Sequence, residues 1–353
     1  MNIAFLIPSL ANKGPVIVVR DLCEQFKKRG HSCTIFYFKD DNDTIDIKCD
    51  VEKISFFRPV SFTAFDVIHI HCFKPAMFIW LHRRMFSEKV LISTLHHPIT
   101  HADFRLLYGR VVSFLLSKSA PIVYNVFDCN VVLSSVQRKL SEPNLTTKMK
   151  IIGNGRNISH NLIKNVSDIS FFNQNKNKRI IGSVSVVTRR KGIDQIVRAL
   201  KLLSDEYILV CIGDGDDLDR LKILAKELHV DNRCFWFGYR KDAANYYKFF
   251  DVYALCSYSE GFPLSFIEAA GYGCSSVLSD IEILRAIVSE DFVCFYQIDN
   301  ISSLASQIQN AYNNRVRYGR SLQEFYLKEL TADKMAEKYL DLYANLIKDK
   351  YGR

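Results

Sequence analysis

The sequence has no apolar run that reaches the roughly 18 residues needed for a membrane-spanning helix. Its first residues, MNIAFLIPSLANKGP, have neither a basic leader nor a small-residue cleavage site, so we expect a first strand there instead of a secretory signal. No G-x-G-x-x-G follows that strand, which argues against an NAD-dependent dehydrogenase. These absences leave a globular protein and remove one large class of nucleotide-binding enzymes.

The ten cysteines lack the C-x-x-C spacing of zinc and redox motifs, and most of them lie within apolar stretches. We therefore expect the buried, reduced thiols of a cytosolic enzyme. The cysteine pattern supports neither a disulfide framework nor a structural zinc ion.

Excess charge of one sign is confined to one half of the chain. Residues 1–160 contain 21 Lys and Arg against 13 Asp and Glu, whereas the remaining residues contain 26 against 25. A basic half suits nucleic acid, an anionic membrane or a phosphate-bearing substrate, and a solubilising surface is the simpler explanation. Nothing beyond charge supports a nucleic-acid partner, so we expect none.

The chain has 353 residues, more than the roughly 250 that one core usually fills, which predicts two domains. Short apolar runs alternate with helical patterns in both halves, as in parallel sheets covered by helices. The strands predicted in the first half are residues 3–7, 34–38, 67–70, 90–94, 122–124 and 131–133. Those predicted in the second half are residues 179–187, 208–212, 234–237, 252–255, 276–278 and 292–295.

This pattern predicts an α/β fold with two Rossmann-like, doubly wound parallel-sheet domains that face a central cleft. We expect the first domain at residues 1–162 and the second at residues 179–331. A polar stretch rich in Asn and Lys, residues 163–178, is predicted to be the linker. Residues 332–353 form an amphipathic helix that we expect to cross back toward the first domain.

Three consecutive cations, Arg189, Arg190 and Lys191, stand between a predicted strand and a predicted helix. The N-terminus of a helix is partly positive, so cations there are unfavourable unless an anion lies nearby. A phosphate group would use these charges together with free backbone N–H groups. Ion pairing to an Asp or Glu across the domain is the alternative, and the local chemistry favours phosphate slightly.

The run SYSEGFPLSFIEAAG, residues 257–271, follows another predicted strand. Pro263 stands where a helix should begin, so the N–H groups of its first turn point toward the carboxyl edge of the sheet. Ligands bind at that edge in open α/β sheets. Glu260 precedes the helix and Glu268 lies in its second turn. The alternative interpretation is that both are ordinary solvated carboxylates.

A third strand-to-helix turn, IGDGDD at residues 212–217, contains Gly213. Its glycines permit a tight turn close to a ligand or to another backbone segment. We favour a turn with an acidic helix start over a metal site, because no third ligand is suggested nearby.

In this order, the motifs resemble those of the retaining glycosyltransferases of family 4, which have the GT-B fold, over nearly the whole chain. The matching segments are residues 9–20, 66–71, 93–97, 151–155, 190–192, 212–215 and 237–239, and the E-x7-E pair Glu260 and Glu268. The most specific of them is EGFPLSFIEA after a strand. The chain departs from the family at Lys13-Gly14-Pro15, where two adjacent glycines are common, and it lacks the arginine of a G-R-L element.

The resemblance implies that a nucleotide-sugar donor is bound by Gly14, Arg189, Gly213, Tyr239, Phe262, Pro263, Leu264 and Glu268. Lys191 and Arg190 would stabilise the leaving phosphate, and Glu260 would bind hydroxyls of the donor sugar. His96 would lie near the reacting sugar from the opposite domain, and a core histidine is nearly as good an explanation. The family implies a UDP- or GDP-sugar donor, no cofactor and no catalytic metal.

The expected acceptor is a glycan or a lipid-linked glycan of bacterial lipopolysaccharide, O-antigen or capsule biosynthesis, at the inner face of the plasma membrane. Residues 73–86 and 104–118 mix apolar side chains with Arg and Lys. They either meet an anionic membrane or form core helices with a basic outer face. The alternative functions are a sugar-nucleotide epimerase of the same fold, which needs no acceptor, and a non-catalytic nucleotide-sugar-binding partner subunit.

Overall fold

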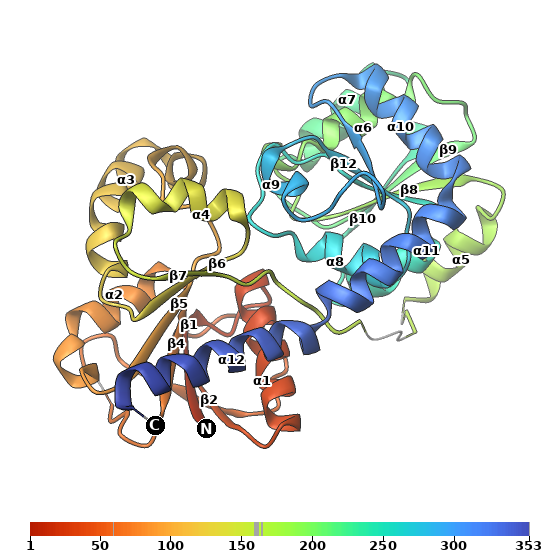
Figure 1. The fold of residues 1–353 in the computed structure, drawn as a ribbon. Coiled ribbons are helices and arrows are strands. Elements are labelled where there is room, and N and C mark those ends of the chain that lie inside the picture. Colours follow the sequence, from red (N-terminus) through yellow and green to blue (C-terminus); the bar gives the residue numbers. More distant parts are fainter. Residues whose placement is uncertain (59, 159–161, 164, 353) are drawn as a thin grey trace. The chain divides into compact units, whose positions relative to one another are not determined.

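The computed structural model describes residues 1–58, 60–158, 162–163 and 165–352, and it leaves the side chains of residues 102–112 undescribed. The chain divides into two compact units (Figure 1). The N-terminal unit comprises Met1–Asn157 and Leu330–Arg353, and the C-terminal unit comprises Ile158–Glu329. Each unit has its own parallel sheet, so the prediction of two α/β domains is confirmed.

Within the described residues, the N-terminal unit has a seven-stranded parallel sheet of order β3-β2-β1-β4-β5-β6-β7. The strands are β1 (Asn2–Ser9), β2 (Ser32–Lys39), β3 (Asp50–Lys53), β4 (Val67–His71), β5 (Val90–Thr94), β6 (Cys129–Val132) and β7 (Met149–Ile151). The chain proceeds from β1 outward to β3 on one side and from β4 outward to β7 on the other. The strand order therefore reverses between β1 and β4, and ligands bind at the carboxyl ends next to such a reversal.

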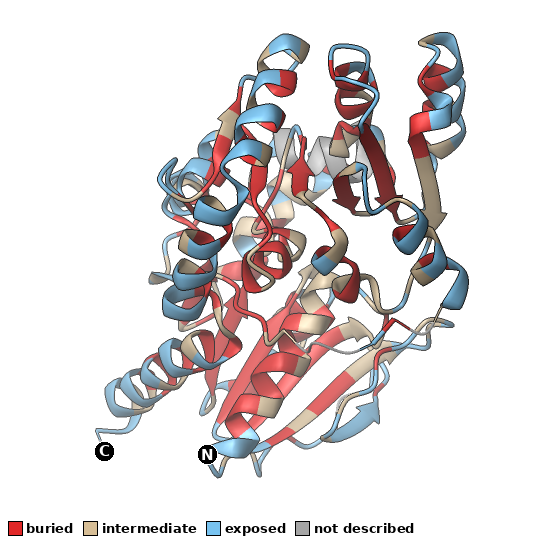
Figure 2. Cartoon of the chain, turned by 90° about the vertical axis from the view of Figure 1, so that its right-hand side faces the viewer, coloured by how far each residue is buried: buried red, intermediate tan, exposed pale blue. Residues whose placement is uncertain are grey.

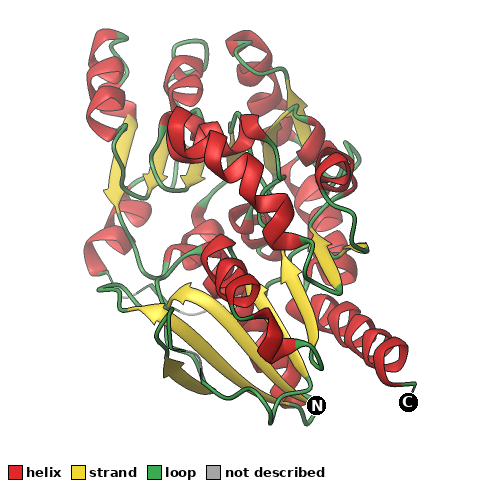
Figure 3. Cartoon of the chain, turned by 90° about the vertical axis from the view of Figure 1, so that its left-hand side faces the viewer, coloured by secondary structure: helices red, strands yellow, loops and turns green. Residues whose placement is uncertain are grey.

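Helices pack on this sheet (Figure 3). They are α1 (Gly14–Lys28), α2 (Phe73–Leu81), α3 (His101–Tyr124), α4 (Ser135–Ser141) and α12 (Ala332–Tyr351), with 3-10 turns at Arg83–Phe86 and Glu142–Asn144. Helix α12 lies beside α1 (Figure 1). The hydroxyl of its Tyr343 lies 2.6 Å from Nδ1 of His69 in β4, and the hydroxyl of Tyr339 lies 2.8 Å from Oγ1 of Thr94 in β5. These bonds tie the C-terminal helix to the N-terminal sheet.

In the part of the chain that is described, the C-terminal unit has a six-stranded parallel sheet of order β10-β9-β8-β11-β12-β13. The strands are β8 (Arg179–Val184), β9 (Tyr207–Ile212), β10 (Cys234–Gly238), β11 (Val252–Leu255), β12 (Ser276–Ser279) and β13 (Cys294–Tyr296). The helices are α5 (Val166–Gln174), α6 (Ile193–Leu200), α7 (Leu218–Glu227), α8 (Leu264–Gly271), α9 (Glu282–Arg285), α10 (Ile301–Asn313) and α11 (Arg315–Phe325). Shorter turns of helix lie at Arg189–Lys191, Asp231–Arg233, Ala243–Phe249 and Tyr326–Leu330.

The central strands of both sheets are buried (Figure 2). In the C-terminal unit, one core cluster joins Ile196 of α6, Leu221 of α7 and Leu304 of α10 to Leu209 and Val277 of the sheet. Strands covered on both faces are mostly apolar, which is why they stood out as nearly continuous apolar runs. None of the helices in the described part of the chain combines the length and apolar character needed to cross a membrane.

Two segments differ from their predicted structure. Residues 122–124 form the end of α3 instead of a strand, and Ile122 is 60% exposed. A short apolar run does not distinguish a strand from a helix end, so this prediction was wrong. The segment 163–178 was predicted to be a linker, but it contains α5, whose Phe172 ring stacks on Phe249 with centroids 4.2 Å apart. The polar composition that suggested a linker belongs to the end of this helix and the turn after it.

Candidate functional site

The strand order of the C-terminal sheet reverses between β8 and β11. The segment after β8 and the segment after β11 therefore leave the sheet at its carboxyl edge, next to one another. These segments contain the basic run of residues 185–192 and the start of the run 257–271, both of which the sequence singled out. A reversal of this kind is where open α/β sheets bind their ligands.

A sharp turn after β8 carries the three consecutive cations. A single 3-10 turn, Arg189–Lys191, is followed by Gly192 with φ +59°, from which α6 starts. A Cβ atom at Gly192 would lie 2.2 Å from the carbonyl oxygen of Cys256. Only glycine allows both this backbone conformation and this close approach, so the basic turn is held against the end of β11.

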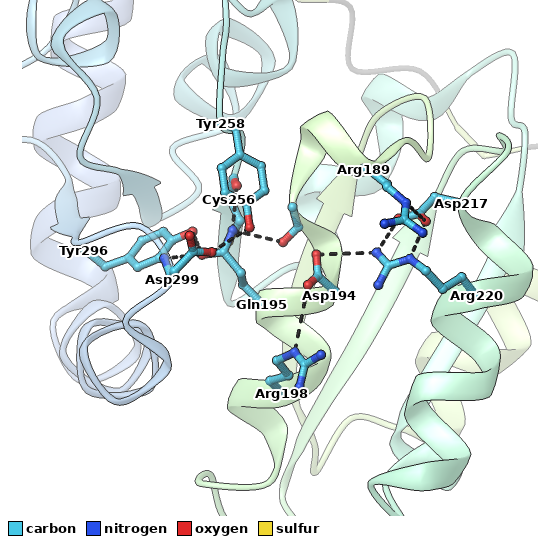
Figure 4. Close-up of polar contacts among 11 residues, drawn as sticks. Arg189, Asp194, Gln195, Arg198, Asp217, Arg220, Cys256, Tyr258, Tyr296 and Asp299 are labelled. Atoms are coloured by element: carbon cyan, nitrogen blue, oxygen red, sulfur yellow. Dashed lines mark hydrogen bonds and ion pairs between the residues drawn. The ribbon is translucent and has the colours of Figure 1, made fainter. Parts of the chain in front are cut away.

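Gln195, in the first turn of α6, holds the two segments together (Figure 4). Its Nε2 donates to the carbonyl oxygen of Cys256 at 3.1 Å, and its Oε1 accepts from the hydroxyl of Tyr296 at 3.0 Å and from the backbone N–H of Asp299 at 2.9 Å. The side chain is fully buried, and a satisfied buried amide specifies one arrangement of its surroundings. The sequence analysis missed this residue.

The carboxylate of Glu260 pairs with two of the three cations of the turn. The Nζ atom of Lys191 lies 2.6 Å from Oε1 of Glu260, and the hydroxyl of Ser257 donates to the same oxygen at 2.6 Å. The guanidinium of Arg190 lies 3.8 Å from Oε2 of Glu260 and donates to the carbonyl oxygen of Ser259. Glu260 is only 7% exposed, and burial alone would raise its pKa. Lys191, Ser257 and Arg190 outweigh burial and lower the pKa of Glu260, so the carboxylate stays charged.

The cations of the basic turn are ion-paired within the unit and are not fully buried. The structure shows the ion pair that was the alternative explanation for the basic turn, and the same cations remain partly open to solvent. The side chain of Lys191 is 13% exposed and that of Arg190 is 30% exposed. A buried carboxylate that pairs with two cations holds both of them in one arrangement.

Arg189 does not join this cluster. Its side chain is 82% exposed and lies 3.8 Å from Asp217, whose carboxylate is bound by Arg220 through two hydrogen bonds (Figure 4). Arg220 also lies 3.7 Å from Asp194. The structure thus separates Arg189 from its two neighbours in sequence.

Helix α8 begins at Leu264, one residue after the predicted position, because Pro263 has extended backbone angles and caps the helix. Glu268, in its second turn, is 8% exposed, so it is not a solvated carboxylate. Glu268 lies near Tyr247. Burial raises the pKa of the Tyr247 hydroxyl most strongly, and the nearby Tyr253 and Glu268 raise it further. Phe262 and Leu264 are half-buried at the start of the helix.

A cavity of about 310 Å³ opens at the carboxyl ends of β8, β9 and β10. Its lining includes two predicted residues, Gly213 and Tyr239, together with Ser185 and Arg240. A Cβ atom at Gly213 would lie 1.8 Å from the carbonyl oxygen of Ser185, so this glycine is required by another backbone segment. The hydroxyl of Ser185 is buried without a hydrogen-bond partner in the described part of the protein. The volume lies at the lower end of the range of small-molecule sites.

Arg240 is fixed at the rim of this cavity by α5. Its guanidinium donates two hydrogen bonds to Asp168, at 2.8 and 3.2 Å, and the hydroxyl of Tyr246 donates to the same carboxylate at 2.5 Å. Burial alone would raise the pKa of Asp168, but Arg240 and Tyr246 lower it overall. The segment expected to be a linker therefore supports the wall of a cavity.

In the N-terminal unit, histidines gather where β4 and β5 end. His71 is the last residue of β4, and its Nδ1 lies 2.8 Å from Nε2 of His96, two residues beyond β5. Burial lowers the pKa of His69 and of His96 to about 3, and it also lowers that of His71. These rings are therefore neutral near pH 7. Gly14, the remaining predicted residue, is the first residue of α1.

Ser257, Gln195 and His71 are the main residues that the sequence analysis did not select. Ser257 precedes Glu260 by three residues, and His71 lies in the I-H-I-H strand end that resembles a segment of the family. Spacing therefore offered a weak signal for two of them. Gln195 offered none, because one polar residue in the first turn of a helix is ordinary.

Two solved structures have the same fold. The chain matches HepE of Anabaena, crystallised with UDP and glucose, with a TM-score of 0.82 and 17% identity over 98% of this chain and 100% of HepE. It matches sucrose-phosphate synthase of Thermosynechococcus elongatus with a TM-score of 0.80 and 19% identity over 99% of each chain. The two sheets, in a chain similar to these two structures, define the GT-B fold.

The sequence comparisons name the family. The family model described as glycosyl transferases group 1 matches residues 166–325, which lie within the C-terminal unit. The O-antigen biosynthesis glycosyltransferase WclY of Escherichia coli is 26% identical over 355 residues, which cover 99% of each chain. The match to the group 1 glycosyltransferases thus covers most of the C-terminal unit, and together with the similarity to WclY it identifies a glycosyltransferase.

Proposed function

We propose that this enzyme transfers a sugar, with retention of anomeric configuration, from a UDP- or GDP-sugar to a glycan or lipid-linked acceptor of bacterial O-antigen or lipopolysaccharide biosynthesis. One observation carries the proposal: Lys191, Arg190 and Glu260 form one cluster where the strand order of the C-terminal sheet reverses. The similarity to WclY over almost the full length supports the pathway. HepE, which binds UDP, supports a uridine donor more than a guanosine donor.

The chemistry of the leaving group explains the cations. Breaking the bond between a sugar and a diphosphate builds negative charge on the leaving phosphate and positive charge on the ring. Lys191 and Arg190, with the backbone N–H groups of the first turn of α8, would stabilise the phosphate, and such preorganised electrostatics is commonly the largest catalytic contribution. Glu260 would bind hydroxyls of the donor sugar while it keeps Lys191 in position. Glu268 would bind the ribose.

The nucleoside would occupy the cavity at the ends of β8, β9 and β10. Tyr239 offers an aromatic face at its wall, and Gly213 leaves room at the turn. The hydroxyl of Ser185, buried without a partner among the described residues, would gain one from the ligand. Arg189 is the predicted donor residue with the weakest support, because it lies apart from Glu260 and is largely exposed.

The proton of the acceptor hydroxyl must also be accommodated. In the proposed reaction, the new glycosidic bond forms as the bond to phosphate breaks, and the leaving phosphate oxygen takes the proton. No separate general base is then needed. His96 would contribute a neutral hydrogen-bonding group near the sugar, as its lowered pKa requires.

The proposal is tested with a panel of UDP-, GDP-, ADP- and dTDP-sugars, screened by thermal shift and followed by a product assay. We expect one nucleotide class to stabilise the protein and its sugar to appear on the acceptor. An isomerised sugar released without an acceptor would instead identify an epimerase. If no sugar nucleotide raised the melting temperature, the proposal would be abandoned.

We also propose that the N-terminal unit docks on an anionic membrane, at the inner face of the plasma membrane. Met77 and Leu81 of α2 and Met85 of the following turn expose apolar side chains beside the exposed Arg83 and Arg84. Apolar side chains mixed with cations suit the interface of an anionic bilayer. Of the second predicted segment, residues 104–118, the side chains of 104–112 lie outside the described residues, and Phe114 and Leu115 of α3 are exposed.

Co-sedimentation with vesicles tests this docking. We expect binding to vesicles that contain phosphatidylglycerol, release by high salt, and weaker binding of Leu81→Asp. Lys226→Asp, on the exposed end of α7 in the other unit, is the matched control. Equal binding of both variants, or no binding of the wild-type protein at low salt, would end the docking proposal and leave the transferase proposal untouched.

A further inference from the structure

A hydrogen bond joins two neutral imidazole rings in the N-terminal unit. Nδ1 of His71 lies 2.8 Å from Nε2 of His96, and the ring centroids are 5.1 Å apart. Burial lowers the pKa of both rings, so neither carries a charge near pH 7. A hydrogen bond between two neutral imidazoles holds one proton, so one ring must donate and the other accept. The tautomer of one ring therefore fixes the tautomer of the other.

The burial of His71 decides which ring donates. His71 is fully buried, and its Nε2 has no hydrogen-bond partner in the part of the chain that the structure describes. If Nδ1 of His71 accepted the bond, Nε2 would carry an N–H group buried without an acceptor. Orphaned buried N–H groups are rarer in proteins than under-satisfied acceptors, and each costs the desolvation of a donor. His71 therefore carries its proton on Nδ1 and donates it to His96.

We propose that His71 is a positioning residue that fixes His96 as a hydrogen-bond donor to the substrate. Because Nε2 of His96 accepts from His71, the proton of His96 lies on Nδ1. Among the described residues this Nδ1 has no hydrogen-bond partner, and the ring is half-buried. His96 thus presents an N–H group to a hydroxyl oxygen of a sugar. This inference rests on the proposed function, since it takes the carboxyl edge of the N-terminal sheet as a substrate-binding edge.

The backbone next to His71 supports that choice of edge. Cys72 follows His71 directly and adopts φ +74° and ψ 165°, a region that is almost restricted to glycine. Such strain persists where the surrounding structure imposes it, and it is concentrated at functional sites. Here it lies between the last residue of β4 and the first turn of α2, next to the reversal of strand order at β1 and β4.

Long-range proton–nitrogen NMR of the histidine rings tests the proposal in the full-length protein at pH 7.5. The signals of His96 are assigned by their loss in His96→Gln. We expect a protonated Nδ1 and a bare Nε2 in the wild-type protein. His71→Phe removes the donor, whereas the amide of His71→Asn replaces the Nδ1 edge of the ring and can donate to His96.

Kinetics of the folded variants provide the second readout. We expect His71→Phe to mix the tautomers of His96 and to lower kcat roughly a hundredfold, as misplacement of a reacting group does, with KM for the donor changed less than about twofold. His71→Asn should restore both tautomer and kcat. A protonated Nε2 of His96 in the wild type, or an unchanged tautomer in folded His71→Phe, would overturn the inference.

Failure to fold and failure of the proposed function are recognised separately. If His71→Phe does not fold, the wild-type spectrum and the spectrum of His71→Asn still decide the tautomer. If His96 has the expected tautomer but no sugar nucleotide binds, the proposed function fails and the tautomer assignment stands.

Discussion

The two units build similar sheets but present different chemistry where the strand order reverses. In the C-terminal unit the site is ionic, with a buried glutamate between a lysine and an arginine. In the N-terminal unit the corresponding edge holds histidines whose pKa burial lowers, so they are neutral. The excess of basic residues in the N-terminal half therefore does not come from charged histidines at this edge. Net charge of a segment thus says little about the electrostatics of the site within it.

This difference suggests a division of roles. An ionic cluster that is already formed suits a diphosphate, whose charge must be stabilised as it leaves. Neutral hydrogen-bond donors and acceptors suit sugar hydroxyls, because these uncharged groups are recognised by the direction of their hydrogen bonds. The matched family model covers residues 166–325, which lie in the C-terminal unit that contains the ionic site.

The largest effect is expected for the ionic site. Lys191→Met removes the cation but keeps most of the apolar stem, and we expect kcat/KM to fall about a hundredfold or more, as for removal of one donor to a developing anion. Steady-state turnover of the best sugar nucleotide measures this. Lys226→Met, an exposed lysine at the end of α7, is the matched control and should retain activity.

Folding of the lysine variant needs its own check, because Glu260 loses its principal partner. The double variant with Glu260→Gln removes the unpaired charge and should restore thermal stability without restoring turnover. Full activity of folded Lys191→Met would remove this lysine from the mechanism.

The second prediction is that the stability of the two units depends differently on pH. The folded pKa of His69 is about 3, below its ordinary value near 6.5, so between these values the unfolded chain binds a proton that the folded protein does not. Stability is therefore complete above pH 6.5 and is lost as the pH falls. Protonation linked to His69 alone should lower the free energy of unfolding by about 2 kcal/mol between pH 7.5 and pH 5. Glu260 has a lowered pKa, so its contribution is lost only below its ordinary range near pH 4.

The two tryptophans allow this measurement in the full chain. Trp80 lies in α2 of the N-terminal unit and Trp236 in β10 of the C-terminal unit. Urea unfolding of Trp236→Phe and of Trp80→Phe, followed by the remaining tryptophan, gives the free energy of unfolding at each place. As the pH falls, we expect the free energy of unfolding reported by Trp80 to decrease and that reported by Trp236 to stay almost unchanged. Equal losses at both, or none at Trp80, would refute the neutral-histidine description.

The smallest predicted effect distinguishes neighbouring arginines. Arg190→Ala should lower kcat/KM about tenfold, the scale of one charge-assisted hydrogen bond. Arg189→Ala should change it less than about twofold, because the side chain is largely exposed and away from Glu260. A larger effect for Arg189 would mean that substrate binding moves it into the cluster.

The fold was predictable because buried parallel strands are largely apolar, and all of the predicted runs except residues 122–124 correspond to strands. The edge strand β3 was not predicted because its residues are polar and exposed. Helix α5 was not predicted because the polar run NQNKNK suggested a linker despite the two phenylalanines of the helix. At the site, proximity in sequence brought the three cations together as one motif. Tertiary structure then separated Arg189 from the other two, and no sequence pattern indicates such a split.

The central claim is that Lys191 binds a phosphate of the donor, and a comparison of diphosphate with monophosphate tests it most directly. Titration calorimetry would measure Kd for the diphosphate and the monophosphate of the nucleoside selected by the sugar-nucleotide panel, with wild type and Lys191→Met. We predict that wild type prefers the diphosphate at least about tenfold, the scale of a charge-assisted hydrogen bond, and that Lys191→Met loses most of this preference. An equal preference in both proteins would contradict the account.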